Sequence, residues 1–176
     1  MRKSIEKAFP HVVEKGCFEI ENRTKFEIFD DTDSRSYTKT KPEQPTHLEV
    51  NNLTERPINF LALDRCLLGA NDSSCDCAVF DDRMLYFVEI KTSDNMDEQH
   101  KKRVQGRKKA IEQLGATIQF FKKRNILMEN YELKALICLV RRGVFPAASS
   151  TNNDARVQFE DEHNAELLEG NTIVFS

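Results

Sequence analysis

Two apolar segments, residues 75–80 and 84–92, constrain the fold of this chain more than any other part of the sequence. Three polar residues, 81–83, separate them. Both segments have the length and the β-branched and aromatic content of buried strands, and a short polar link of this kind is typical of a tight turn. The region therefore predicts a β-hairpin.

The register of this hairpin decides which side chains share a face of the sheet. A two-residue turn at positions 82–83 places Asp76 opposite Glu89. Because side chains alternate between the two faces of a strand, Asp76, Glu89 and Lys91 then project from one face. A three-residue loop would change the parity and turn Glu89 to the other face.

Two carboxylates one strand-width apart repel each other when both are ionised. Bound Mg²⁺ or Mn²⁺ removes that repulsion, because hard cations prefer carboxylate and carbonyl oxygens. Such a cation polarises a phosphodiester and lowers the pKa of a bound water, while Lys91 orients the water or stabilises charge on the phosphate. The alternative interpretation is that the three residues are solvated at strand ends, with Lys91 in an ordinary ion pair with Glu89 or Asp76.

Other segments indicate the surrounding fold. Residues 58–68 are apolar nearly throughout, and periodicity cannot decide between a buried strand and a buried helix there. Residues 96–123 have helical spacing, although Gly106 and Gly115 weaken the pattern, and residues 133–140 have strand length. The order of strands, helix and strand predicts an α/β fold with a mixed central β-sheet flanked by helices.

The length of 176 residues suits one domain with three parts. Residues 57–141 are the predicted core. Residues 1–56 are an N-terminal extension, in which alternating apolar residues around positions 18–28 predict a β-hairpin and a long polar loop follows. Residues 142–176 form a polar tail that ends in a last strand.

The five cysteines and the lack of long apolar segments indicate where in the cell the protein is expected. Free cysteine behaves as a small hydrophobe, and most of these cysteines lie beside or within apolar runs, so we expect reduced, packed thiols. No segment approaches the roughly 18 apolar residues of a membrane span, and the N-terminus lacks the apolar core of a signal peptide. A cytoplasmic protein without membrane contact is the expectation.

Charge is distributed unevenly along the chain. The net charge is −3, yet residues 95–124 contain nine basic and only three acidic residues. A basic segment on an acidic body is a candidate phosphate-binding element, with a solvated helix face as the alternative. The sequence has no tryptophan to provide a stacking surface for single strands, which favours duplex DNA and leaves RNA open. The candidate phosphate contacts are Lys101, Lys102, Arg103, Lys108 and Lys109.

The order of several short motifs resembles the core of the PD-(D/E)XK nuclease superfamily, which has the restriction-endonuclease-like fold. The motifs are Leu63-Asp64-Arg65-Cys66-Leu67-Leu68, Ser74-Cys75-Asp76-Cys77-Ala78-Val79-Phe80, Leu85-Tyr86-Phe87-Val88-Glu89-Ile90-Lys91 and Ala110-Ile111-Glu112-Gln113-Leu114. The resemblance covers residues 58–141, about half of the chain, and favours a strand at 58–68. It departs from the nominal pattern at Cys75, which stands where the superfamily name places proline.

The resemblance implies roles for individual residues. Asp76 and Glu89 would bind the metal ion together with the backbone carbonyl of Ile90. Lys91 would be the catalytic lysine, and Gln113 would position the nucleophile or the phosphate. Asp64 is a further candidate metal ligand, and a local ion pair with Arg65 is its alternative role.

These implications define two hypotheses of different kinds. The first is a Mg²⁺- or Mn²⁺-dependent DNA endonuclease that works with a protein partner or as a homo-oligomer, within a bacterial defence or restriction assembly. The second is a non-catalytic subunit of the same fold that binds nucleic acid or protein. Metal binding at Asp76 and Glu89 distinguishes the two.

Overall fold

The computed structural model describes residues 1–31, 34–54, 56–67, 73–92, 99–126, 128–140, 149–150 and 153–176; the side chains of residues 92, 99–103, 149, 150 and 153 are outside this description. The strands form two sheets. One has seven strands in the order β1 (Phe18–Glu21), β5 (Ile58–Ala62), β6 (Cys77–Phe80), β7 (Met84–Thr92), β8 (Glu132–Val140), β10 (Glu166–Glu169) and β9 (Ser149–Ser150). The other has four strands in the order β11 (Thr172–Phe175), β4 (Leu48–Asn52), β2 (Lys25–Asp30) and β3 (Ser36–Thr38).

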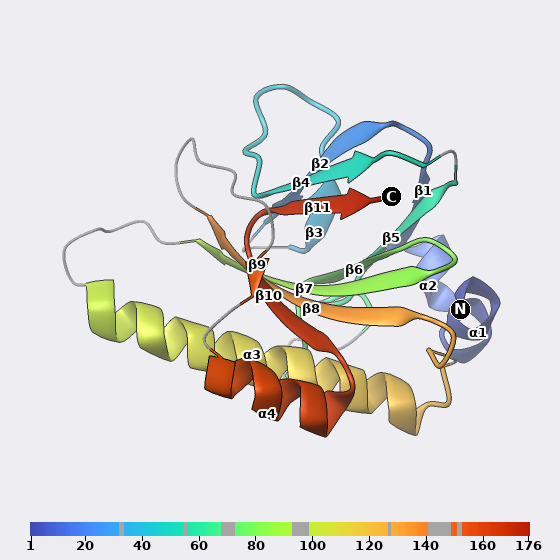
Figure 1. Cartoon of the computed structure of the whole chain (residues 1–176). Coiled ribbons are helices and arrows are strands. Elements are labelled where there is room, and N and C mark those ends of the chain that lie inside the picture. The colour runs from blue at the N-terminus through green and yellow to red at the C-terminus, as the bar shows by residue number, and fades with distance from the viewer. Residues whose placement is uncertain are drawn as a thin grey trace.

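The described helices are α1 (Arg2–Ala8), α2 (His11–Glu14), α3 (Gln99–Lys123) and α4 (Asn153–His163). Figure 1 shows α3 and α4 on one side of the seven-stranded sheet and the four-stranded sheet on its other side. Buried side chains from both sheets and from α3 belong to one hydrophobic cluster. The α/β class and the mixed sheet are therefore confirmed. No helix in the described ranges is long and apolar enough to cross a membrane.

Strand β7 is buried on both of its faces, which explains why its sequence is apolar nearly throughout. Tyr86 packs against Phe175 of β11, with ring centroids 5.5 Å apart. The next residue, Phe87, points the other way and packs against Phe121 of α3 at 5.1 Å. A strand covered on both faces has no polar face to give alternation. The side chains of Glu89 and Lys91, which share the parity of Phe87, therefore lie on the α3 side of the sheet.

The turn between β6 and β7 has the two-residue length that the sequence analysis required. Phe80 pairs with Leu85 in an antiparallel register, and the Asp81 N–H donates to the Met84 carbonyl at 3.1 Å. The Asp81 carboxylate accepts hydrogen bonds from the N–H groups of Arg83 and Met84, both at 2.7 Å. An aspartate that bonds the backbone in this way stabilises a tight turn. The predicted hairpin is confirmed, and so is its register from the turn back to Cys77.

Helix α3 connects β7 to β8, which pairs with β7 in parallel, so the strand–helix–strand prediction for this region is confirmed. The apolar run at 58–68 is a strand only as far as Ala62, and a turn follows over residues 64–67. The prediction of a strand through residue 68 is therefore wrong in its second half. The Leu63 N–H bonds the Asp76 carbonyl at 2.9 Å, so the chain there still follows the start of β6.

The predicted N-terminal hairpin is wrong. Strands β1 and β2 both exist, but β1 pairs with β5 in the seven-stranded sheet and β2 pairs with β3 and β4 in the other sheet. Alternation of apolar and polar residues identifies a strand but not its partner. Here the strand partners come from residues 36–62 rather than from the adjacent segment.

Three further expectations are corrected. Residues 36–38, in the predicted polar loop, form strand β3, and the polar tail contains α4 and β10 in addition to the predicted last strand, β11. The four-stranded sheet, and not a second layer of helices, covers the other face of the central sheet (Figure 1). Short polar strands of this kind depend on pairing with a neighbour and carry little sequence signal.

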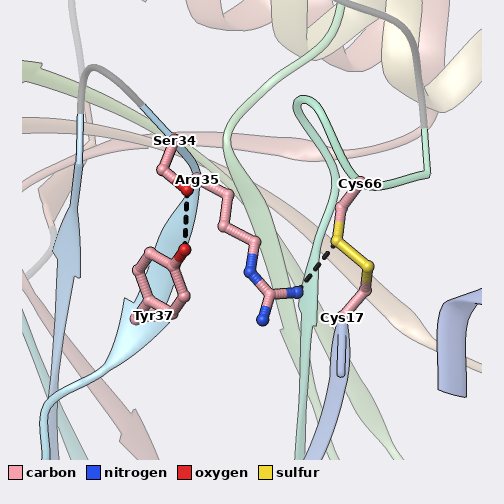
Figure 2. Close-up of a disulfide and its surroundings, with 5 residues drawn as sticks. All are labelled: Cys17, Ser34, Arg35, Tyr37 and Cys66. Atoms are coloured by element: carbon pink, nitrogen blue, oxygen red, sulfur yellow. Dashed lines mark hydrogen bonds between the residues drawn. A yellow bond between two sulfur atoms is a disulfide. The ribbon is translucent and has the colours of Figure 1, made fainter. Parts of the chain in front are cut away.

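Cys17 and Cys66 form a disulfide, with Cα atoms 5.9 Å apart, so the expectation of reduced thiols is wrong for these two residues (Figure 2). Cys75, Cys77 and Cys138 are free and buried, as expected. The disulfide joins the residue before β1 to the turn after β5. Since β1 and β5 are paired, the fold brings together two cysteines that are 49 residues apart in the sequence.

We expect thiol titration of the denatured, unreduced chain to find three free thiols, rising to five after reduction. Reduction should lower the free energy of unfolding by up to about 4 kcal/mol, because the bond closes a long loop in the unfolded chain. Peptide mapping without reductant should recover Cys17 joined to Cys66. Five reactive thiols before reduction would contradict the disulfide.

The two glycines of α3 should respond in opposite ways to alanine. A Cβ at Gly115 would lie 2.6 Å from His163 Nε2, and that ring is held by Phe159 at 4.5 Å between ring centroids. A Cβ at Gly106 would meet no described atom within 4 Å. We expect Gly106→Ala to stabilise the protein by up to about 1 kcal/mol through helix propensity. Gly115→Ala should destabilise it by about 1–3 kcal/mol through overpacking, as measured by denaturant unfolding. Equal effects at both positions would contradict this packing.

Candidate metal and phosphate site

The candidate site lies where β6 begins and β7 approaches its C-terminal end. Asp76 directly precedes β6, and its N–H donates at 3.0 Å to the carbonyl of Val88, which is also the register partner of Cys77. The predicted pairing of Asp76 with Glu89 is therefore displaced by one residue: Asp76 and Cys77 both lie opposite Val88, as in a β-bulge, because an unbroken register would turn the Asp76 N–H away from β7. The Asp76 carboxylate also accepts a hydrogen bond from the Ile90 N–H at 2.5 Å. The two acids are near each other, since the charge of Glu89 contributes to the raised pKa of Asp76.

Glu89 is almost completely buried, with 1% of its surface exposed. Its Oε1 contacts the ammonium of Lys91, whereas its Oε2 has no hydrogen-bond partner in the described part of the chain. Burial raises the pKa of Glu89 to about 7, and the positive charge of Lys91 opposes this rise. A buried carboxylate oxygen without a partner costs free energy unless a cation or a proton compensates it.

Asp76 is also buried, at 9% exposure. Burial, followed by the nearby negative charge of Glu89, raises the pKa of Asp76 well above its usual range, while the Ile90 N–H and Lys91 act in the opposite direction. Two buried acids with raised pKa values, one of them raised partly by the charge of the other, form a site that a nearby positive charge would stabilise.

Lys91 and Gln113 complete the group. The Lys91 ammonium donates to Gln113 Oε1 at 3.1 Å in addition to its contact with Glu89. The Gln113 amide donates to the Ser74 carbonyl at 2.8 Å, so Gln113 joins α3 to the segment that precedes Asp76. The structure thus brings together the four residues that the sequence analysis proposed for catalysis.

Thr117 is a positioning residue that sequence reasoning missed. Its side chain is fully buried one helical turn after Gln113, where its hydroxyl accepts a hydrogen bond from the Cys75 N–H and donates to the Gln113 carbonyl, both at 2.9 Å. It thereby holds the start of β6 against α3. A threonine on the apolar stripe of the helix, four residues after Gln113, was the available signal.

The structure supports the Ile90 carbonyl as a metal ligand more directly than it supports Asp64. In an antiparallel pair, the N–H and C=O of one residue point toward the same neighbouring strand. Since the Ile90 N–H donates to Asp76, the Ile90 carbonyl faces the Asp76 side of β7 as well. Asp64 lies in the turn after β5 and forms an ion pair with Arg65 at 3.9 Å, while its charge contributes to the raised pKa of Glu89. Its role as a ligand stays a prediction.

Two of the proposed phosphate contacts on α3, Lys108 and Lys109, lie about one helical turn before Gln113. Lys109 is four residues before Gln113 and therefore on nearly the same helix face, and both Lys108 and Lys109 are exposed. Lys108 is 4.0 Å from Glu112, with 80% of its side chain exposed. The side chains of Lys101, Lys102 and Arg103 lie outside the described residues, although their backbone is part of α3.

The donor set suits a hard divalent cation. Among the described residues, no three His, Cys, Asp or Glu side chains are grouped closely enough to form a complete metal site. Two carboxylates and one carbonyl nevertheless match the chemistry of Mg²⁺, which is usually bound by one or two carboxylates and keeps several waters. The partnerless Oε2 of Glu89 is the atom that such a cation would satisfy. Comparisons with protein-family models, curated proteins and solved structures found no significant match to this chain.

Glu89→Gln should change how stability depends on pH when no divalent cation is present. The usual pKa of glutamate is 4.5, and in the folded chain Glu89 has a pKa of about 7. Between these values the folded state holds a proton that the unfolded state has lost, so this group lowers the free energy of unfolding as pH rises. At pH 8 we expect the variant to be about 1–3 kcal/mol more stable than the wild type, and the gain should vanish near pH 4.

Chemical denaturation in EDTA across this pH range measures the effect. Glu112→Gln is a matched control, because Glu112 lies on α3 with 63% of its side chain exposed. If the difference in free energy of unfolding between the wild type and Glu89→Gln stays constant from pH 4 to pH 8, the pKa of Glu89 is not raised by folding.

Proposed function

We propose that this chain is a Mg²⁺- or Mn²⁺-dependent nuclease that hydrolyses phosphodiester bonds in nucleic acid, with residues 57–141 as a restriction-endonuclease-like core. The observation that carries the proposal is the pair of buried acids, Asp76 and Glu89, which lie near each other, with Glu89 Oε2 lacking a partner in the described part of the chain. Duplex DNA is the proposed substrate and internal cleavage the proposed mode. The order of β5, β6, β7, α3 and β8 supports the fold assignment.

Asp76, Glu89 and the carbonyl of Ile90 would hold the cation. When bound, the cation supplies Lewis-acid polarisation of the phosphodiester and lowers the pKa of a coordinated water. The residues of the chain fix where this happens. The Ile90 N–H orients the Asp76 carboxylate, and burial on the α3 side of β7 limits the positions that the Glu89 side chain can take.

Lys91 and Gln113 supply donors beside the two acids. The Lys91 ammonium is held between Glu89 and Gln113 and is 26% exposed, so a phosphate placed at the site can reach it. In that position it stabilises negative charge that develops on the phosphate. Gln113 is fixed by the Ser74 carbonyl and therefore keeps Lys91 in place at little cost in side-chain entropy.

The first turns of α3 would contact the nucleic acid. Figure 1 shows this end of α3 extending beyond the strands of the sheet. With a rise of about 1.5 Å per residue, Lys102 lies roughly 16 Å along the helix axis from Gln113. The basic residues Lys101, Lys102, Arg103, Lys108 and Lys109 would thus lie along phosphates that flank the cut, and would give salt-dependent and largely sequence-independent binding.

A non-catalytic binding subunit is the second candidate function. The observation that favours it is the contact between Lys91 and Glu89, which is the ordinary ion pair expected of a structural role. That role, however, leaves the buried Glu89 Oε2 without a partner in the described part of the chain. In either role the chain could act in a defence or restriction assembly, alone as a homo-oligomer or with a protein partner.

Cleavage assays with supercoiled plasmid, linear duplex and single-stranded DNA test the proposal. We expect cutting with Mg²⁺ or Mn²⁺ and none in EDTA. Asp76→Asn, Glu89→Gln and Lys91→Met should each lower the rate at least about 100-fold, since each removes a group that acts on developing charge. Glu112→Gln and Lys123→Met, both on α3 and outside the group around Glu89, should cut like the wild type.

Two results would overturn the nuclease proposal. Cutting that survives all three site substitutions would place the activity elsewhere or in a contaminant. DNA binding without cutting under any of these conditions would favour the non-catalytic subunit. A divalent cation that raises the melting temperature of the wild type but not of Glu89→Gln would support the site even before a substrate is found.

A further inference from the structure

Asp30, the last residue of β2, is held in place by two neighbours of the four-stranded sheet. The Ser36 hydroxyl donates to Asp30 Oδ1 at 2.9 Å, and the Asp30 N–H donates to His47 Nδ1 at 3.0 Å. Ser36 is itself buried, and Asp30 is half-buried. The carboxylate of Asp30 therefore has a fixed position in spite of lying at a strand end.

One contact places this strand end next to β8 and β7. The His47 carbonyl accepts a hydrogen bond from the Cys138 thiol at 3.2 Å. Cys138 of β8 is the parallel partner of Ile90 in β7. The residue that bonds the Asp30 backbone thus lies over the part of the central sheet that carries the Ile90 carbonyl.

A second contact, independent of the first, places the same strand end next to the turn after β5. The Asp31 N–H donates to the Arg35 carbonyl at 3.2 Å, and the Arg35 guanidinium donates to the sulfur of Cys66 at 2.9 Å (Figure 2). Cys66 is two residues after Asp64. The residues around Asp30 therefore contact β8, beside Ile90, and the turn that carries Asp64.

The charge of Asp30 acts on the two buried acids. It contributes to the raised pKa of Asp76 and, to a smaller extent than burial, to that of Glu89. Among the residues that the structure describes, no lysine or arginine forms an ion pair with Asp30, whereas Asp64 pairs with Arg65. Glu89 Oε2 also lacks a partner among these residues, so the carboxylates of Asp30 and Glu89 each have an oxygen that no described lysine or arginine contacts.

We propose that Asp30 is a positioning residue of the cation site, which holds the water molecules of a divalent cation bound by Asp76 and Glu89. The inference rests on the proposed function. Mg²⁺ and Mn²⁺ keep several waters when only one or two carboxylates bind them, and carboxylates of the outer shell orient such ligands. The four-stranded sheet, three of whose strands come from the predicted N-terminal extension, would then complete the active site.

Mn²⁺ binding to the full chain, measured by titration calorimetry, tests this role. We expect Asp30→Asn to weaken Mn²⁺ affinity about 10- to 100-fold, the usual effect of losing an outer-shell partner. Its melting temperature in EDTA should not fall, because removing a half-buried charge relieves desolvation. Asp30→Glu should restore part of the affinity. Ser36→Ala, which frees the carboxylate without removing it, should give a smaller loss. Asp161→Asn on the exposed face of α4 is the charge-matched control and should bind like the wild type.

The outcomes separate this inference from the proposed function. Wild-type affinity in a folded Asp30→Asn, with binding lost in Glu89→Gln, would overturn the role of Asp30 and leave the cation site standing. Absence of Mn²⁺ binding in the wild type would overturn both. If Asp30→Asn fails to fold, unchanged affinity in Ser36→Ala and Asp30→Glu overturns the role, and reduced affinity in both supports it.

Discussion

The antiparallel pairing of β6 with β7 is the contact on which the candidate site depends. A tight turn that Asp81 stabilises through two backbone hydrogen bonds sets the register, which pairs Cys77 with Val88 and so brings the adjoining residues Asp76 and Glu89 near each other. A shift of one residue would move Glu89 to the side of the sheet that packs against β11. The turn lies at the far end of the hairpin from the two acids, yet by setting the register it determines where their side chains lie.

Packing against α3 then gives these acids their properties. Phe121 covers Phe87, two residues before Glu89, and Thr117 and Gln113 bond the segment that leads to Asp76. The same contacts exclude water from Glu89 and so raise its pKa. Burying the two ionised acids costs free energy, and a cation bound between them would offset that cost. Cation binding would therefore also stabilise the folded sheet.

Sequence reasoning succeeded where the secondary structure of a segment depends on the residues of that segment itself. The hairpin, α3 and β8 have strong periodicity and lie next to their partners, so their elements and the grouping of Asp76, Glu89, Lys91 and Gln113 could be predicted. It failed for β1 and β2, whose pattern identified strands but not the two different sheets that they join. It also missed Asp30, because a polar residue at the end of a short strand looks like any loop residue until the sheets are packed together.

The sequence by itself determined the parity of the central hairpin, because the turn length and the alternation of side chains are local properties. It also determined the basic character of α3. Only the tertiary structure decided that β2, β3 and β4 form a second sheet with β11, that Cys17 meets Cys66, and that the charge of Asp30 acts on the two acids. These results depend on contacts between distant segments, whose free energy arises from burial shared by both partners and cannot be read from either one alone.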